Sequence, residues 1–242
     1  MQHWLWLLVI PFCGVSGYAG EQPAAERLKQ LGAHVFTNRS GTVIEVTLNN
    51  NPRIFDGDLE LLNAFSDLAD LSLENTKISD AGIQRLKKCQ KLEWLNLYRT
   101  QIGDAALKHL AAFPNLKHLP IGETRITDTG LKHLTNMSQL VYLGLRGTSV
   151  GDAGLRHVHV LTNLTGLHLG ATRISNQALT KLPPNLEKLW LHDTAVSDDA
   201  IPTLSRFTNL KELHIYRTKI SPAGVMVLRR ELSRCRVVEQ PE

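Results

Sequence analysis

The sequence predicts an α/β solenoid, in which short parallel strands form a concave sheet and short helices line the convex side. Two observations carry this prediction. The chain of 242 residues contains 40 leucines, and most of them recur with a period of 24 residues from Val43 onward. Within each period, apolar residues first alternate and then recur at every third position, which is typical of a strand followed by a helix. A unit this short cannot bury its own apolar edges, so neighbouring units must stack.

A leucine marks the start of each unit. Seven such leucines follow one another at spacings of 24 residues, with one spacing of 22: Leu68, Leu92, Leu116, Leu140, Leu164, Leu186 and Leu210. An imperfect unit begins at Val43, which brings the total to about eight repeats of 22–25 residues. In the unit at Leu116, strand alternation directs Leu119 and Ile121 inward and the residues between them outward.

Polar residues at fixed positions predict where each helix begins and how each turn is held. A small polar residue followed by Asp marks most helix starts, as in Thr127-Asp128, and Ser221-Pro222 takes that place in the last unit. Seven threonines share one turn position: Thr76, Thr100, Thr124, Thr148, Thr172, Thr194 and Thr218. We expect their hydroxyls to satisfy backbone groups of the turns. Cys89 falls in an apolar position and is expected to be buried.

The pattern LxxLxLxxTxI followed by GLxxL resembles that of leucine-rich repeats. The likeness covers about 195 of the 242 residues and is nearest to ribonuclease-inhibitor-like repeats, in particular the cysteine-containing subclass of F-box proteins. Here Thr holds the Cys or Asn position of that subclass, and the repeat is shorter. Secreted leucine-rich repeat proteins of bacteria look closer, including the amino-terminal helix and the Cys near the carboxyl end, here Cys235. The resemblance implies protein recognition on a curved surface and no common enzymatic activity.

The ends of the chain depart from the repeat. Residues 1–19 are uncharged and largely apolar, with small residues before a possible cleavage after Ala19, so they predict a signal peptide. The alternative is an uncleaved membrane anchor formed by residues 1–20. Residues 20–42 predict a cap helix and a hairpin strand, residues 43–228 the repeats, and residues 229–242 a carboxyl-terminal cap and tail. Cleavage would make the protein secreted or periplasmic.

Composition and spacing exclude several classes of protein. The net charge is only +4 and the basic residues are spread along the chain, so we expect no nucleic-acid partner. Three cysteines are too few for a disulfide-rich scaffold. His109, His133 and His157 recur on the predicted convex side without a carboxylate in the same row, so we expect no metal site and no cofactor.

The outward strand positions form three rows on the predicted concave face. Beyond the signal segment, both tryptophans, all three tyrosines and four of the nine histidines fall in these rows. Because binding interfaces are enriched in aromatic side chains, we take the rows as the candidate ligand-binding site. The candidates are Trp94, Asn96, Tyr98, His118, Tyr142, Arg146, His168, Trp190, His192, His214 and Tyr216.

Between the aromatic residues, the central units carry small ones: Pro120, Gly122, Gly144, Gly166 and Gly170. We therefore expect a trough with a shallow floor, walled by Trp94 and Tyr98 on one side and by the aromatic residues around Trp190 on the other. Four strand spacings separate the two tryptophans, about 19 Å, which suits an extended peptide or one helix. The alternative is that the aromatic residues only stack on one another and stabilise the sheet.

The favoured function is a non-enzymatic module that binds a protein or peptide on this concave face. A glycan-binding module is the alternative, because aromatic rings with Asn and His partners also suit sugars. An F-box-like substrate-recognition domain is a further alternative, although residues 21–41 are too short to form an F-box. The concave histidines lack a regularly placed carboxylate or nucleophile, so no catalytic residue is expected. Four histidines in the rows also suggest that binding changes near pH 6.

Overall fold

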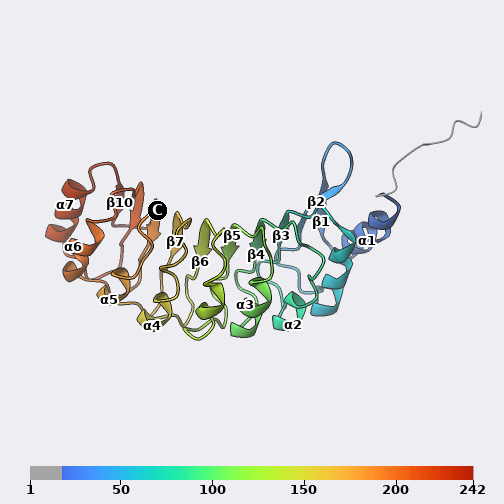
Figure 1. Cartoon of the computed structure of the whole chain (residues 1–242), viewed down its shortest axis with the longest axis horizontal. Helices are drawn as coiled ribbons and strands as arrows, with labels where there is room; N and C mark the ends of the chain where they lie inside the picture. The colour runs from blue at the N-terminus through green and yellow to red at the C-terminus, as the bar shows by residue number, and fades with distance from the viewer. Residues whose placement is uncertain (1–17, 242) are drawn as a thin grey trace, which may run out of the picture.

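A computed structural model describes residues 18–241, with only the backbone described for residues 18 and 19. The molecule is a curved stack of coils, with strands along the concave side and helices along the convex side (Figure 1). Within these residues, ten strands form one sheet whose order in space is their order in the chain, from β1 to β10. The first two strands pair antiparallel, and each later pair is parallel. The predicted α/β solenoid is confirmed.

The strands are β1 (His34–Thr37), β2 (Val43–Thr47), β3 (Asp70–Ser72), β4 (Trp94–Asn96), β5 (His118–Pro120), β6 (Tyr142–Gly144), β7 (Gly166–His168), β8 (Lys188–Trp190), β9 (Glu212–His214) and β10 (Arg236–Val238). The α-helices are α1 (Tyr18–Gln30), α2 (Asp80–Ile83), α3 (Asp104–Leu110), α4 (Asp152–Leu155), α5 (Asn176–Leu179), α6 (Ile201–Leu204) and α7 (Pro222–Glu231). Three 3₁₀ helices complete the convex side: η1 (Asp56–Ala64), η2 (Leu131–Leu134) and η3 (Asp198–Ala200).

One helix begins later than the sequence predicts. The segment after Thr127 is a turn, and η2 starts only at Leu131. The side chain of Thr129 donates a hydrogen bond to Asp104 of the preceding coil, at 2.5 Å. Because a β-branched residue bound in this way holds the first turn, the regular helix is delayed.

The interior is a continuous column of aliphatic side chains. Leu119 of β5 pairs in register with Leu143 of β6, and both are fully buried. The same inward position is filled in every coil, and the buried cluster runs from Leu28 near one end to Leu232 near the other. Each coil therefore packs only on its two neighbours.

Carboxylates at the helix starts also join each coil to the next. Asp128 accepts a hydrogen bond from the backbone N–H of Gly151 at 2.7 Å, and Asp152 accepts from both the N–H and the hydroxyl of Ser175. The same inter-coil contact is made by Asp56, Asp80, Asp104, Asp198 and, in the shortened coil, by Asn176. We call these residues the aspartate row. The sequence predicted a helix start at most of them, although not at Asp56 or Asn176, and the structure adds that all of them bond to the following coil.

The glycine of the GLxxL pattern makes room for this row. A Cβ atom at Gly154 would lie 2.5 Å from Oδ1 of Asp128, and one at Gly82 would lie 2.5 Å from Oδ1 of Asp56. Such an approach is far inside van der Waals contact. Glycine at these positions therefore follows from the close passage of a carboxylate.

The turn that leaves each strand is also repeated. The hydroxyl of Thr148 donates to the carbonyl of Leu145 at 2.7 Å, and all seven turn threonines make the equivalent bond, as predicted. The residue just before the threonine has a left-handed backbone, as at Glu123 (φ 50) and Asp193 (φ 55). This conformation turns the chain away from the sheet towards the convex side.

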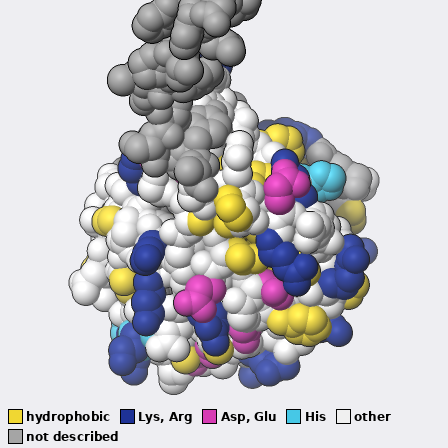
Figure 2. Space-filling model, turned by 90° about the vertical axis from the view of Figure 1, so that its right-hand side faces the viewer, with side chains coloured by type: hydrophobic (Ala, Val, Ile, Leu, Met, Phe, Trp, Pro, Cys, Tyr) yellow, Lys and Arg dark blue, Asp and Glu magenta, His cyan; other side chains and the backbone are white. Residues whose placement is uncertain are grey.

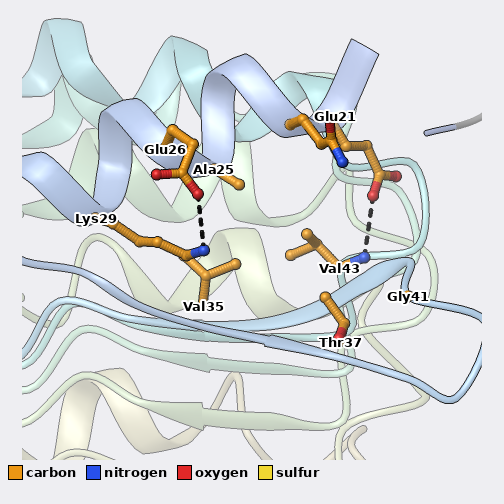
Figure 3. Close-up of a pocket in the computed structure, with 9 residues that line it drawn as sticks. Glu21, Ala25, Glu26, Lys29, Val35, Thr37, Gly41 and Val43 are labelled. Atoms are coloured by element: carbon orange, nitrogen blue, oxygen red, sulfur yellow. Dashed lines mark hydrogen bonds and ion pairs between the residues drawn. The ribbon is translucent and has the colours of Figure 1, made fainter. Parts of the chain in front are cut away.

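The amino-terminal cap is α1 packed beside the β1–β2 hairpin. The helix ends before Gly32, which has a φ of +95. The buried carboxylate of Glu21 accepts a hydrogen bond from the N–H of Val43 at 3.0 Å, which ties the helix to the hairpin (Figure 3). Lys29 pairs with Glu26 at 3.0 Å above a gap of about 460 Å³ between the two elements. The charged groups at this gap thus pair with groups of the cap itself.

At the other end, α7 and β10 close the stack. Ser221 accepts a hydrogen bond from the N–H of Gly224 at 3.1 Å and caps α7, as predicted. Cys235 is partly buried against the last coil, and Cys89 is fully buried as expected. Burial raises the pKa of Cys89 to about 12, and burial together with Glu212 raises that of Cys235 to about 11. Both thiols are therefore protonated at neutral pH.

The predicted signal peptide lies outside the described residues, apart from the first two residues of α1. Within residues 18–241, no helix combines the length and the apolar character needed to cross a bilayer. Viewed from the amino-terminal end, the surface carries basic and acidic side chains interspersed with small hydrophobic areas (Figure 2).

Candidate binding surface on the concave sheet

The candidate residues lie in the rows that strand alternation predicted. Trp94 of β4 pairs in register with His118 of β5, and Trp190 of β8 lies between His168 and His214 of the neighbouring strands. The third row follows two residues after its strands and contains Tyr98, Arg146, His192 and Tyr216. The two ends of the face differ in how these side chains are packed.

Six candidates form a ring cluster on the carboxyl-terminal half: Tyr142, His168, Trp190, His192, His214 and Tyr216. The rings of His192 and Tyr216 stack with centroids 4.5 Å apart and planes 6° apart. Trp190 stacks on His214 at 5.7 Å and meets the edge of Tyr142 at 6.2 Å. Such pairs contribute about 0.5–1.5 kcal/mol each beyond their burial. Cross-strand stacking, the alternative interpretation, therefore describes this half of the face.

A chain of hydrogen bonds runs through the ring cluster. Nδ1 of His192 lies 2.8 Å from a carboxylate oxygen of Asp193, and its Nε2 lies 3.0 Å from Nε2 of His168. Because the carboxylate can only accept, His192 donates through Nδ1 and accepts from His168 through Nε2. His192 is 4% exposed, so this arrangement also fixes its ring.

His168 does not change its charge near pH 6. Burial, followed by the charges of His192 and Arg146, lowers the pKa of His168 to about 3. Burial also lowers the pKa of His192, against the opposing effect of Asp193. His168 is therefore neutral at pH 6, and the expected change of charge there is wrong for this residue.

The amino-terminal half of the face is more open. Trp94 stacks on His118 with ring centroids 4.8 Å apart, but the indole remains 38% exposed. The side chains of the ring cluster are half-buried or buried. Burial and the neighbouring Lys117 lower the pKa of His118, so the stacked imidazole favours its neutral form. An aromatic pair with one exposed ring, that of Trp94, thus begins this half of the face.

A groove of about 240 Å³ runs from this pair across the strands. Its lining residues are Trp94, His118, Val141, Tyr142, Thr165, Gly166, Glu187 and Lys188. Aromatic and aliphatic side chains form the start and the middle, and one acidic and one basic residue form the far rim. The groove follows the first outward row, from β4 to β8.

The expected shallow trough is wrong over the rest of the face, because neighbouring rings lie above the glycines. A Cβ atom at Gly122 would lie 3.0 Å from the ring of Tyr98, and one at Gly144 would lie 3.1 Å from the hydroxyl of Tyr142. His192 covers Gly170 in the same way. The central glycines therefore accommodate aromatic side chains from their own or an adjacent coil, and the floor that they were expected to leave open is filled.

Arg146 is held in a network that sequence reasoning missed. Its guanidinium donates to the hydroxyl of Tyr98 at 2.7 Å and lies 3.2 Å from Glu123, which also accepts from Tyr98 and from Arg99. Burial alone would raise the pKa of Glu123, but the bonds from Arg99 and Tyr98 outweigh it and lower the pKa. Glu123 was missed because it lies in the left-handed turn, outside the strand rows. Its position directly after a third-row residue was the available signal.

Two other polar candidates, His214 and Asn96, also have carboxylate partners. Nε2 of His214 lies 2.7 Å from Glu212, and Asn96 donates to Glu74 at 3.1 Å. Among the described residues, no group of three or more His, Cys, Asp or Glu side chains is arranged to hold a metal ion. What the face offers a ligand is therefore aromatic surface, one groove and a rim of polar groups.

The fold and this face define a leucine-rich repeat solenoid, and solved structures of that class are similar to it. An internalin (InlF) from Listeria monocytogenes matches with a TM-score of 0.65 and 26% identity over 86% of this chain and 59% of the internalin. Internalin C2 of the same organism matches with a TM-score of 0.63 and 24% identity over 82% of this chain and 81% of its own. This chain thus spans less than two thirds of InlF.

A plant receptor has the same fold. The leucine-rich repeat ectodomain of the Arabidopsis receptor kinase HAESA, solved in complex with an extended IDA peptide hormone ligand, matches with a TM-score of 0.66. It is 21% identical over 91% of this chain and 41% of the receptor chain. No protein-family model matches the chain, and no curated protein matches it in sequence. The comparisons therefore establish the fold.

Proposed function

We propose that the concave face is a non-enzymatic recognition surface that binds a protein or peptide segment in the groove that begins at Trp94. The observation that carries this proposal is the exposure of Trp94, 38%, at the open end of an apolar groove. An exposed indole is costly in water, and interfaces are enriched in tryptophan. The rings at the opposite end of the face are already packed on one another, so they wall the site.

The groove suits an extended segment. It spans the strands from β4 to β8, about 19 Å at about 4.8 Å for each strand spacing. Its apolar middle fits a hydrophobic side chain, and Glu187 and Lys188 at the far rim can bond to polar groups of the segment. The HAESA ectodomain, a solenoid of the same fold, is solved with a peptide ligand, which supports this choice of partner.

The test is selection of binding peptides from a displayed random library, followed by titration of the selected peptides. Trp94→Ala should weaken binding by about tenfold or more, the loss typical of a central aromatic anchor. Met226→Ala, which removes an exposed hydrophobic side chain from α7, is the matched control and should leave binding unchanged. Selected peptides that bind both variants as tightly as the wild type would refute the proposal.

A glycan is the second candidate, and the same exposed indole favours it because sugar rings stack on tryptophan. A glycan array probed with the wild-type protein distinguishes the two. Binding to a defined glycan that is lost in Trp94→Ala, with no peptide selected, would replace the first proposal with this one.

The resemblance to secreted bacterial repeat proteins, together with residues 1–19, supports an extracytoplasmic location. Cys89 is buried, Cys235 is partly buried and both thiols are protonated, so an oxidising compartment would leave them unpaired. Amino-terminal sequencing of the protein recovered outside the cytoplasm tests this. A start at Gly20 would support cleavage after Ala19, and recovery of the intact chain in membranes would support the anchor.

A further inference from the structure

One coil of the solenoid is two residues shorter than the others, and the missing residues fall on its convex side. Twelve positions separate Asp152, at the start of α4, from Leu164 of the next coil. Only ten separate Asn176, at the start of α5, from Leu186. Strands β7 and β8 still pair in register, so the strand side of the coil keeps its normal length.

The shortening leaves a notch between the helices of adjacent coils. Two cavities, of about 500 and about 150 Å³, meet there and share Thr180, Leu182 and Pro184 as lining residues. We call them together the convex notch. The remaining lining residues are Arg156, His159 and Lys181 on one side and Leu179, Thr203, Arg206 and Phe207 on the other. Leu179 of α5 lines the notch, and α5 lies on the helix side of the molecule (Figure 1).

The convex notch concentrates positive charge. Arg156, Lys181 and Arg206 are exposed, and no acidic residue lines either cavity. Within residues 18–241 none of the three makes an ion pair, whereas Arg85 pairs with Glu60 on a full-length coil at 3.1 Å. Unpaired cations around a shared hollow produce a positive potential that attracts anionic groups.

The floor of the notch is apolar. Leu182 and Phe207 are nearly buried, while Pro184 is exposed at the junction of the two cavities. An occupant must therefore combine negative charge with at least one hydrophobic group. Nucleic acid fits less well, because only three fixed cations line the notch and its one exposed ring, the imidazole of His159, is hydrogen-bonded to the backbone carbonyl of Arg156.

We propose that the convex notch binds an acidic segment of a partner protein that places a hydrophobic side chain on Leu182 and Pro184. The carboxylates of the segment pair with Arg156, Lys181 and Arg206 at the rim. This surface is on the opposite side of the coils from the concave groove, so it does not depend on the function proposed for that groove. A partner could occupy one while the other is filled.

The test is an NMR titration of the isotope-labelled protein with a short peptide that alternates Glu with Leu. Amide signals of Thr180, Lys181 and Arg206 should shift, and the effect should weaken as salt is added because the charges at the rim are exposed. The same peptide with Gln in place of Glu should produce no shift at these residues. Equal shifts with the Gln peptide, or shifts confined to the concave strands, would overturn the proposal.

Charge-reversal variants locate the site further. The double substitution Lys181→Glu and Arg206→Glu should weaken binding of the Glu–Leu peptide by about tenfold, since it converts two attractions into repulsions. Lys108→Glu, on the convex side of a full-length coil, is the matched control and should have no effect. Inserting two residues after Leu182 to restore the 24-residue length should fill the notch and abolish binding. An equal loss in the control, or tighter binding of a single-stranded oligonucleotide than of the peptide, would contradict the proposal.

Discussion

The interior of the coils and the concave surface repeat in different ways along the molecule. Inside, the same residue type recurs from coil to coil: leucine in the core, threonine in the turn and aspartate at the helix start. On the concave surface the first row passes from Trp94 through His118 and Tyr142 to Gly166 and Lys188. Stacking imposes the same contact on every coil, so residues that recur belong to the scaffold. Residues that vary on the surface do not make these repeated contacts between coils, so they are the residues available to bind a ligand.

The largest difference between the two regions should be seen on removing one side chain from each. Leu143→Ala should lower the free energy of unfolding by about 2–5 kcal/mol, because it leaves a cavity in a core that is one coil wide. Trp94→Ala, which shortens an exposed ring, should cost about 1 kcal/mol or less, the value of one stacked pair. Denaturant unfolding measures both. A loss for Trp94→Ala as large as that for Leu143→Ala would place this surface residue in the scaffold.

Substitutions in the aspartate row should have the next largest effect on the free energy of unfolding. Asp104 accepts hydrogen bonds from the backbone and hydroxyl of Thr127 and from Thr129, so Asp104→Ala should cost about 2 kcal/mol. Asp80→Ala removes one side-chain hydrogen bond, to the N–H of Gly103, and should cost about half as much. Denaturant unfolding of the two variants at neutral pH provides the comparison, and equal losses would show that the additional hydroxyl bonds contribute nothing.

The carboxylate of Asp104 should also make the stability of the fold depend on pH in the acid range. Burial would raise the pKa of Asp104, but the hydrogen bonds from Thr127 and Thr129 outweigh it and lower the pKa below its usual value of 3.8. Its contribution to stability is therefore complete above that value and is lost as the pH falls through the folded-state pKa. Stability curves of Asp104→Ala and wild type should converge in strong acid.

His168 offers a test on the concave side. Its folded-state pKa, about 3, lies below the ordinary value of 6.5, so the unfolded chain takes up a proton first as the pH falls. The stability that the neutral ring provides is complete above pH 6.5 and is lost between there and pH 3, by at most about 1.4 kcal/mol for each pH unit. Thermal unfolding from pH 7 to pH 5 should show a smaller decline in His168→Gln. His34→Gln, at an exposed position, should keep the wild-type slope.

The smallest effect is expected at one turn. Thr148→Val keeps the shape of the side chain but removes the hydroxyl bond to the carbonyl of Leu145, and should cost about 1 kcal/mol. Thr148→Ser retains the hydroxyl and should cost less. If thermal unfolding ranks the two variants in the opposite order, the methyl group of threonine, and not its hydroxyl, stabilises the turn.

The fold was predictable because its determinants are local and repeated. The alternation around Leu119 and the apolar spacing after it indicate a strand and a helix within one unit. Because the same pattern recurs in the following units, it also indicates that the units stack into a solenoid. The turn hydroxyl of Thr148 and the cap at Ser221 were predictable for the same reason, since each bonds within a few residues of itself.

Contacts between coils were much harder to predict. The carboxylate of Asp128 bonds to Gly151, 23 residues further on, and nothing in the local sequence distinguishes that contact from an ordinary helix start. The ring of Tyr142 lies over Gly166 because of the side-chain rotamer that Tyr142 adopts once the sheet has formed. Strand alternation therefore assigns each ring to a face but does not say whether the space beside it is open. For this reason the sequence predicted a shallow trough where the structure has a ring cluster and one groove.

The order of the strands in space is also their order in the chain, from β1 to β10. As a result, a whole coil can be gained or lost without changing any contact except those at a single junction. The protein can therefore change length by duplication or deletion of 24-residue segments, and each such event would widen or narrow the concave face by one strand. The coil of 22 residues breaks this interchangeability, because only its own neighbours match its shorter helical side. Swapping complete coils between positions should thus be tolerated along the first part of the solenoid and fail around β7 and β8.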